Sequence, residues 1–375
     1  MSRQLLSQVF AASLALAVSC AFAQALELRV ASGAPPAFPA HDPAYLTFIK
    51  EVAAETNGEI TARHIGMDVA NLTAMVSNLQ DGTLDVGNII ASYFPADFPH
   101  MMLVGELSVL GDFGNAMAAS TIEFYANCGD CQAEMKKVGL TYLATLSTSG
   151  FELITARKPV RSTADIKGMR IRSTGANTAA WLEAMGAIAI NVPFNEEYQA
   201  LSSGLADGTL ASPAQLISNR LAEIVKYYTK MSVLTISSSP NFPMRAQTYA
   251  GLTEDQRKAV IKAATRGAMT FEPRSRQQAQ EGIVDLLKRG GEIVEPDQEL
   301  LDANAKFRQA VIQTAIKRGN ETFGIPDAEA KVMQYVALVE KWNRIIEPIQ
   351  DDPRAIAEKV WEEVWSKQDF SKYGL

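Results

Sequence analysis

The spacing of apolar residues changes repeatedly along the first ninety positions. Apolar and polar residues alternate over 26–32, which favours a strand with one buried face, and 59–65 and 84–90 also predict strands. Between these segments, apolar residues recur at helical spacing behind the capping residues Asp42 and Asn71. The resulting β-α-β-α-β order predicts a parallel sheet with helices on both faces.

The same kind of pattern returns in the middle of the chain. Ser162 and Asp165 have the spacing of a capping box. The tetrapeptide Asp-Gly-Thr-Leu occurs at 81–84 and again at 207–210, each time between an apolar helix and a strand. We therefore expect an α/β fold with two lobes of similar build. The second lobe is predicted to contain strands at 169–173 and 187–192 and helices at 177–185 and 194–203.

The last third of the chain is rich in helix. Helical spacing runs over 253–289, where Pro273 is expected to kink or break the helix. A strand is predicted at 292–294, and further helices at 297–319 and 326–349. In the tail, Trp361 and Trp365 lie four positions apart and form an apolar stripe that we expect to pack on the body.

The first 25 residues have the features of a secretory leader. Arg3 precedes a mostly apolar run that ends in small residues at Ala21-Phe-Ala23 or Ala23-Gln-Ala25. A membrane-anchoring helix and lipid attachment at Cys20 are the alternatives. A cleaved leader places the mature protein in the periplasm. The net charge of −7 argues against nucleic-acid binding, which requires a basic face.

Two cysteines remain after cleavage, Cys128 and Cys131. In an oxidising compartment they predict a small disulfide, whose short loop contributes only about 2 kcal/mol. A redox-active pair is the alternative. A metal site would need two more ligands, and none lies at standard spacing.

The sequence lacks the usual short catalytic and cofactor motifs. It has no phosphate-binding Walker loop, no dinucleotide GxGxxG and no Gly-x-Ser-x-Gly elbow. Its three histidines, His41, His64 and His100, lie in separate segments. We therefore expect no catalytic residues, no metal and no cofactor, and favour a binding protein over an enzyme.

Three stretches together carry a family resemblance. They are Leu79–Gly87 with the following Ser-Tyr-Phe-Pro, Asp165–Arg172, and Pro193–Gly208. In these stretches the chain resembles the DctP-type solute-binding proteins of TRAP transporters, over roughly 26–345. The resemblance implies a type II-like periplasmic-binding-protein fold, with lobes joined by crossing strands and a long helix. It also implies a small-molecule ligand and a TRAP membrane permease as partner.

A receptor that signals to a membrane sensor is an alternative function with the same fold. We expect a monomer.

The resemblance also suggests how the chain divides. The expected parts are a signal peptide at 1–25, lobe I at 26–149 and about 238–277, lobe II at 150–237 and about 278–345, and a helical tail at 346–375.

Arg172 is the main candidate for ligand binding. It lies at the carboxyl end of a predicted strand, where open α/β sheets bind ligands. In the family the matching arginine holds a ligand carboxylate by a two-pronged salt bridge, which suits the rigid guanidinium fork. The alternative is an arginine that braces the lobe.

Two positions depart from the family pattern. Many relatives have a second cleft arginine where this chain has Glu152, and often an asparagine where it has Ala211. These changes disfavour a dicarboxylate and favour a compact monocarboxylate, or a ligand with an amine for Glu152. Alternatively, Glu152 pairs with Arg172 or another cation.

Several other residues lie near predicted strand ends or helix starts. Each also has a structural explanation, such as helix capping by Asn71 or core packing by the aromatic residues. The further candidates for ligand contact are Tyr93, Asn71, Phe194, His41, Trp181, Phe242 and Ser32.

Overall fold

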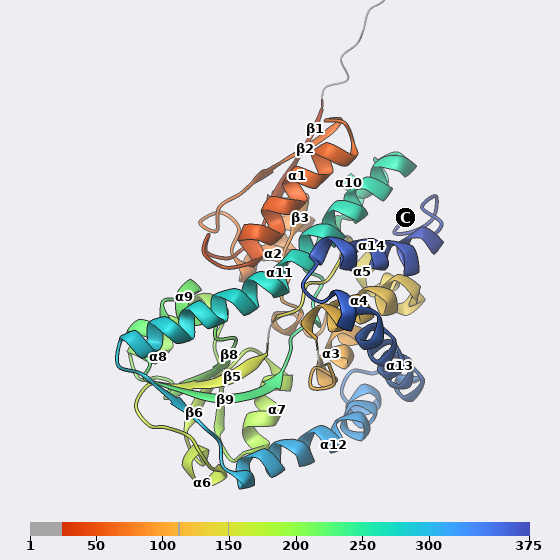
Figure 1. The fold of residues 1–375 in the computed structure, drawn as a ribbon. Coiled ribbons are helices and arrows are strands. Elements are labelled where there is room, and N and C mark those ends of the chain that lie inside the picture. The colour runs from red at the N-terminus through yellow and green to blue at the C-terminus, as the bar shows by residue number, and fades with distance from the viewer. Residues whose placement is uncertain (1–24, 112, 149) are drawn as a thin grey trace, which may run out of the picture.

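The computed structural model describes residues 25–111, 113–148 and 150–375, which form two sheets surrounded by helices (Figure 1). The expected leader lies outside these ranges except for its last residue. Within the described part of the chain, no helix combines the length and apolar character needed to cross a membrane. The two-lobed α/β fold is the one that the sequence predicts.

The first sheet has the strand order β2-β1-β3-β10-β4. Strand β1 pairs in parallel with β2 and β3, and β10 is antiparallel to β3 and β4. The strand expected at 84–90 is much shorter, although Leu84 and Ile89 are fully buried. Burial rather than strand pairing explains why that run is apolar. The strands are β1 Leu26–Ala31, β2 Ile60–His64, β3 Val86–Gly87, β4 Leu140–Tyr142 and β10 Pro243–Arg245.

Helices cover this first sheet. Asn71 caps its helix as expected, because its side chain accepts hydrogen bonds from the amides of Thr73 and Ala74. The expectation that Asp42 caps a helix is wrong, because the π-helical turn η1 already begins at Ala40 and Asp42 lies inside it with extended backbone angles. The elements are η1 Ala40–Tyr45, α1 Leu46–Glu55, η2 Leu72–Ala74, α2 Met75–Gln80, η3 Ala91–Tyr93, α3 Pro99–Glu106, α4 Gly114–Asn127, α5 Gly129–Lys137 and α10 Ala246–Ala250.

The second sheet has the order β11-β9-β5-β8-β6-β7. The predicted capping box between Ser162 and Asp165 is present at the start of the short helix that precedes β6. The predicted strand-helix-strand-helix order after this box is also present. The strands are β5 Phe151–Thr155, β6 Arg170–Ser173, β7 Ile188–Asn191, β8 Gly208–Ala211, β9 Tyr227–Leu234 and β11 Glu292–Val294; the helices are α6 Thr163–Ile166, α7 Ala176–Ala184, η4 Phe194–Glu196, α8 Glu197–Ser202, α9 Gln215–Ser218 and η5 Leu221–Glu223.

The long helix α11, Glu254–Lys288, runs along both sheets (Figure 1). Of the two outcomes expected at Pro273, a kink or a break, the break does not occur, because the helix continues through the proline. Ala264 belongs to the core of the first lobe and Leu286 to the core of the second, so packing on both sides of the proline stabilises a continuous helix. Two chain segments also cross between the sheets, and Thr148 and Ile236 bond them together.

The C-terminal helices differ from the expected division. Val332 and Tyr335 of α13 pack in the core of the first lobe, so this helix is not part of the second lobe. In the tail, the buried Trp365 donates from Nε1 to Oγ1 of Thr265 on α11 at 3.1 Å, so it packs on the body. The elements are α12 Gln298–Glu321, α13 Ala328–Ile346, η6 Glu347–Ile349, α14 Pro353–Glu363 and η7 Trp365–Lys367.

Candidate functional site

A cavity of about 80 Å³ lies between the two lobes. Phe38 and Tyr93 line it from the first lobe, and Phe151, Phe194 and Gln215 line it from the second. Its walls are mainly apolar and aromatic. Among the described residues, no lysine, arginine or histidine lines it directly.

Direct contacts hold the lobes together beside this cavity. Ser92 donates from Oγ to the carbonyl oxygen of Thr174 at 2.7 Å, and the amide of Phe194 donates to the hydroxyl oxygen of Tyr93 at 2.7 Å. The rings of Phe38 and Phe194 also meet across the cleft, with centroids 4.8 Å apart. The structure is therefore a closed conformation of the two lobes.

Arg172 is completely buried on β6. Its Nε donates to the carbonyl oxygen of Val192 at 2.9 Å, and its Nη1 donates to Oε1 of Glu197 at 3.2 Å. Its Nη2 has no hydrogen-bond partner among the described residues. Leaving a buried donor unpaired costs about 1–3 kcal/mol, and more for a charged group. One prong of the guanidinium fork is thus available to an acceptor.

Glu197 is the acidic partner that sequence reasoning missed. Its carboxylate accepts from Oγ1 of Thr209 at 2.7 Å and from Nδ2 of Asn219 at 2.8 Å. With its amide nitrogen turned toward Glu197, Gln215 donates two more bonds, at 2.6 and 3.0 Å. The signal was present in the family stretch from 193 to 208, but only the fold shows that Glu197 points at Arg172.

Arg172 lies just behind the wall of the inter-lobe cavity. Burial raises the pKa of Tyr93, and the positive charge of Arg172 opposes that rise, which places the guanidinium near the phenol. Gln215 lines the cavity and also bonds to Glu197, the partner of Arg172. The buried arginine is therefore connected to two residues of the cavity wall.

The structure does not bring Glu152 beside Arg172. Neighbouring strand residues point to opposite faces, so Phe151 lines the inter-lobe cavity while Glu152 lines a separate one of about 350 Å³. Tyr228, Glu272 and Arg276 share that second cavity. Burial raises the pKa of Glu152 to about 7, although a hydrogen bond with Tyr228 and the charge of Lys230 act against the rise.

The other candidates divide between cavity and core. Tyr93 and Phe194 line the inter-lobe cavity. Trp181 and Phe242 are fully buried core residues instead: Trp181 donates to Oδ1 of Asn304 at 3.0 Å, and Phe242 stacks on Tyr45 with centroids 4.6 Å apart.

The remaining candidates lie beside the first sheet and do not line the inter-lobe cavity. Nδ1 of His41 contacts Nε2 of His64 at 3.2 Å, and the amide of the buried Ser32 donates to the same Nε2. Burial and the nearby His41 lower the pKa of His64 to about 4. Asn71 is engaged in capping its helix.

Comparison with known sequences identifies the class of protein. The chain matches the family described as "Bacterial extracellular solute-binding protein, family 7" over residues 30–318, and it belongs to this family. It is 26% identical over 226 residues to the 2,3-diketo-L-gulonate-binding periplasmic protein of Escherichia coli, covering 60% of this chain and 66% of that one. It is also 26% identical over 193 residues to a solute-binding protein of Albidiferax ferrireducens, covering 48% of this chain and 53% of that one. The chain thus spans between half and two thirds of these relatives.

Solved structures share the fold over most of the chain. A TRAP periplasmic solute-binding protein from Bordetella bronchiseptica, with bound (R)- and (S)-mandelate, has a TM-score of 0.73 at 22% identity, covering 84% of this chain and 99% of that one. A TRAP solute-binding protein from Rhodoferax ferrireducens, in complex with benzoate, has a TM-score of 0.72 at 18% identity. The match covers 85% of this chain and 99% of that one. The expectations of this fold and of a receptor rather than an enzyme are confirmed.

Proposed function

We propose that this protein is the extracytoplasmic receptor of a TRAP transporter and that it binds a small organic acid between its lobes. The observation that carries the proposal is the unpartnered Nη2 of the buried Arg172, next to the inter-lobe cavity. A ligand carboxylate that reached this nitrogen would accept a charge-assisted hydrogen bond. Glu197 already accepts from Nη1, so the guanidinium has only Nη2 left to offer, which fits a ligand with a single carboxylate.

The cavity walls favour a ligand with an apolar body. Phe38, Phe151 and Phe194 supply aromatic surface, which binds apolar groups better than the hydroxyl groups of a sugar acid. The closed cavity of about 80 Å³ is smaller than the roughly 150 Å³ that holds benzene in an engineered protein. A ligand of benzoate size therefore requires the lobes to open and to close around it less tightly.

An amine-bearing ligand is less well supported in this cavity. The sequence suggested Glu152 as the partner of an amine, but Glu152 lines the separate cavity along α11. A ligand held by Arg172 has no contact with Glu152 that would favour an ammonium group. The proposal for the inter-lobe cavity is therefore a compact monocarboxylate.

The proposed location is the periplasm, and the proposed partner is a multi-span TRAP permease. The expected leader at 1–25 and the periplasmic relative in Escherichia coli support the location. A sensor receptor of the same fold remains the alternative partner hypothesis. Uptake of labelled ligand by vesicles that contain a TRAP permease, in the presence of this protein, would distinguish the two.

A thermal-shift panel tests the ligand class. We expect benzoate or mandelate to raise the unfolding temperature by several degrees, since a ligand at 1,000 times its Kd adds about 4 kcal/mol. Benzamide and benzylamine have a similar ring but no carboxylate, and we expect neither to have an effect. Stabilisation by benzylamine alone would contradict the proposal.

Arg172→Lys tests the arginine itself. Lysine keeps a positive charge for Glu197 but lacks the second prong of the guanidinium. We expect affinity for the best acid of the panel, measured by calorimetry, to fall by about 2 kcal/mol or more. Arg170→Lys is the matched control, because Arg170 lies two positions earlier on β6 and pairs with Asp207 at the surface. Equal affinities of Arg172→Lys and Arg170→Lys would refute the assignment, provided that both variants fold.

A further inference from the structure

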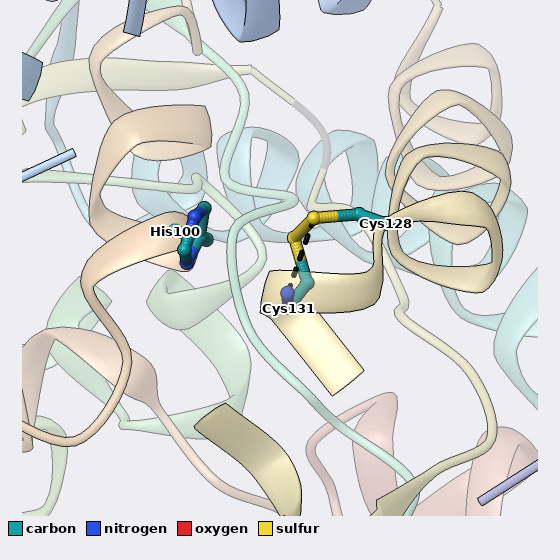
Figure 2. Close-up of side chains that lie close together, drawn as sticks. All are labelled: His100, Cys128 and Cys131. Atoms are coloured by element: carbon teal, nitrogen blue, oxygen red, sulfur yellow. Dashed lines mark hydrogen bonds between the residues drawn. A yellow bond between two sulfur atoms is a disulfide. The ribbon is translucent and has the colours of Figure 1, made fainter. Parts of the chain in front are cut away.

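A buried cluster in the first lobe combines the two cysteines with a histidine. Cys128 and Cys131 form a disulfide at the start of α5, and His100 of α3 lies beside it (Figure 2). One ligand atom from each residue lies within 4.8 Å of the other two. The spacing of these residues does not match a short metal-binding motif, because the whole of α4 separates His100 from Cys128.

The ring of His100 is held by a carboxylate. Nδ1 of its ring lies 2.8 Å from Oε2 of Glu134, and the same oxygen accepts from the backbone amide of His100 at 3.0 Å. The other carboxylate oxygen of Glu134 accepts from the hydroxyl of Tyr125. A carboxylate that holds Nδ1–H fixes the tautomer in which Nε2 is a free acceptor, and metal-binding histidines usually have such a partner.

We propose that reduction of the Cys128–Cys131 disulfide creates a binding site for one Zn²⁺, formed by both thiolates and His100. A dithiol reductant supplies two electrons and two protons and becomes a disulfide itself. The two cysteine thiols then lose their protons as the metal binds. Two thiolates and one imidazole form a known zinc ligand set, which leaves a fourth position for water.

The geometry agrees with a site that opens on reduction. Ligand atoms around a tetrahedral zinc lie about 3.5 to 3.8 Å apart, given Zn–S bonds of about 2.3 Å and Zn–N bonds of about 2.0 Å. Breaking the disulfide lets the sulfurs separate to such a distance, while the imidazole moves inward from its present position. Cys128 is 8% exposed and Cys131 is fully buried, so Cys128 is the more accessible end of the bridge for a reductant.

The site is separate from the proposed ligand cavity. None of its three ligands lines the cavity between the lobes. The inference therefore does not depend on the proposed function, and either can fail alone. Reduction and zinc binding would give the first lobe a second state that responds to thiols and metal rather than to the organic acid.

Cobalt binding tests the proposal, because Co²⁺ bound to thiolates has a charge-transfer absorption band. The full mature protein is reduced with a dithiol, freed of reductant under argon and titrated with Co²⁺. We expect one Co²⁺ per reduced chain, with the thiolate band, and displacement of Co²⁺ by Zn²⁺. The oxidised protein is expected to show no such band. Circular dichroism of the reduced protein confirms that it remains folded.

Variants separate this site from other metal-binding groups. We expect His100→Gln to bind Co²⁺ at least about tenfold more weakly, and Glu134→Gln to lose about 10- to 100-fold through the misplaced imidazole. His64→Gln is the matched control, since it removes one member of the close His41–His64 pair, which lies outside the proposed site, and it should bind Co²⁺ like the natural protein. The proposal would be overturned if the reduced protein unfolded or lacked the thiolate band. It would also be overturned if His100→Gln bound Co²⁺ as tightly as the natural protein.

Discussion

At the scale of single residues, the protein stabilises buried charges in two different ways. Arg172 and Glu197 are both fully buried and pair with each other, and neutral donors satisfy the rest of the carboxylate. Glu152 is also largely buried, but its bonded partner is the neutral phenol of Tyr228. The first pair keeps a charged group beside the cavity, while Glu152 responds to pH instead.

Glu152 should make stability depend on pH. Its folded-state pKa of about 7 lies above the ordinary value of 4.5, so the folded protein binds the proton more tightly than the unfolded chain does. The stabilisation is complete below pH 4.5 and is lost as pH rises through 7. In Glu152→Gln this loss is absent. We expect the free energy of unfolding in urea to fall between pH 5 and pH 8 by up to about 3 kcal/mol more in the natural protein than in the variant.

Glu106 and Glu272 also have pKa values raised by burial, but they are common to both proteins and cancel in the comparison. Parallel pH profiles for the two proteins would contradict the assignment to Glu152.

At the scale of elements, closure depends on the fit between η3 and the start of α7. Ser92 follows β3 of the first lobe and bonds to Thr174 after β6 of the second. Gly175, next along the chain, faces Ser92 so closely that an added Cβ would lie 2.6 Å from the Cβ of Ser92. The absence of a side chain at Gly175 therefore permits the two elements to meet.

Gly175→Ala should shift the lobes toward an open state. The added methyl group clashes with Ser92 only when the lobes close. At a φ of 157° it also strains the backbone of the second lobe in either state, so a control must carry the same kind of strain. We expect a larger radius of gyration in solution scattering without ligand and weaker binding of the acid found in the thermal-shift panel. Gly168→Ala is the control, because Gly168 lies just before β6 of the same lobe at a positive φ of 73°, and an added Cβ there meets no atom within 4 Å. An unchanged radius of gyration and affinity in Gly175→Ala would show that closure does not depend on this contact.

At the scale of the whole molecule, the C-terminal tail supports the first lobe from outside the ligand cavity. Trp365 is fully buried, lies edge-on to Tyr373 with centroids 5.4 Å apart, and bonds to α11 through Thr265. The matched family region ends at residue 318, so this support lies beyond it. The tail braces the same long helix that connects the two lobes.

Removing the Trp365 side chain should therefore reduce stability without changing ligand recognition. We expect Trp365→Ala to lower the free energy of unfolding by about 3–5 kcal/mol, since it leaves a cavity in a packed core. Trp361→Ala, at a partly buried position, should cost less. The affinity of the variant for the organic acid, measured at a temperature where the variant is folded, should equal that of the natural protein. A large loss of affinity in the folded variant would mean that the tail also influences closure.

Much of the architecture was predictable because it depends on local spacing. The capping box at Ser162 and the helix start at Asn71 follow from side chains that bond to nearby backbone amides. Positions such as Trp181 and Phe242 were not predictable, because a residue near a strand end can point to a cavity or to a core. That Pro273 does not break α11 has a related reason: its local cost is outweighed by packing on two lobes at once.

The sequence alone determined the periodicity of the elements, the two-lobed α/β fold and the position of Arg172 at the end of a strand, because these depend on neighbours along the chain. Only the tertiary structure decided that Glu197 pairs with Arg172, that Glu152 lies in another cavity, and that His100 meets the cysteines. These relations join residues from different elements. They depend on how the sheets and helices pack in space, which the spacing within a single element does not specify.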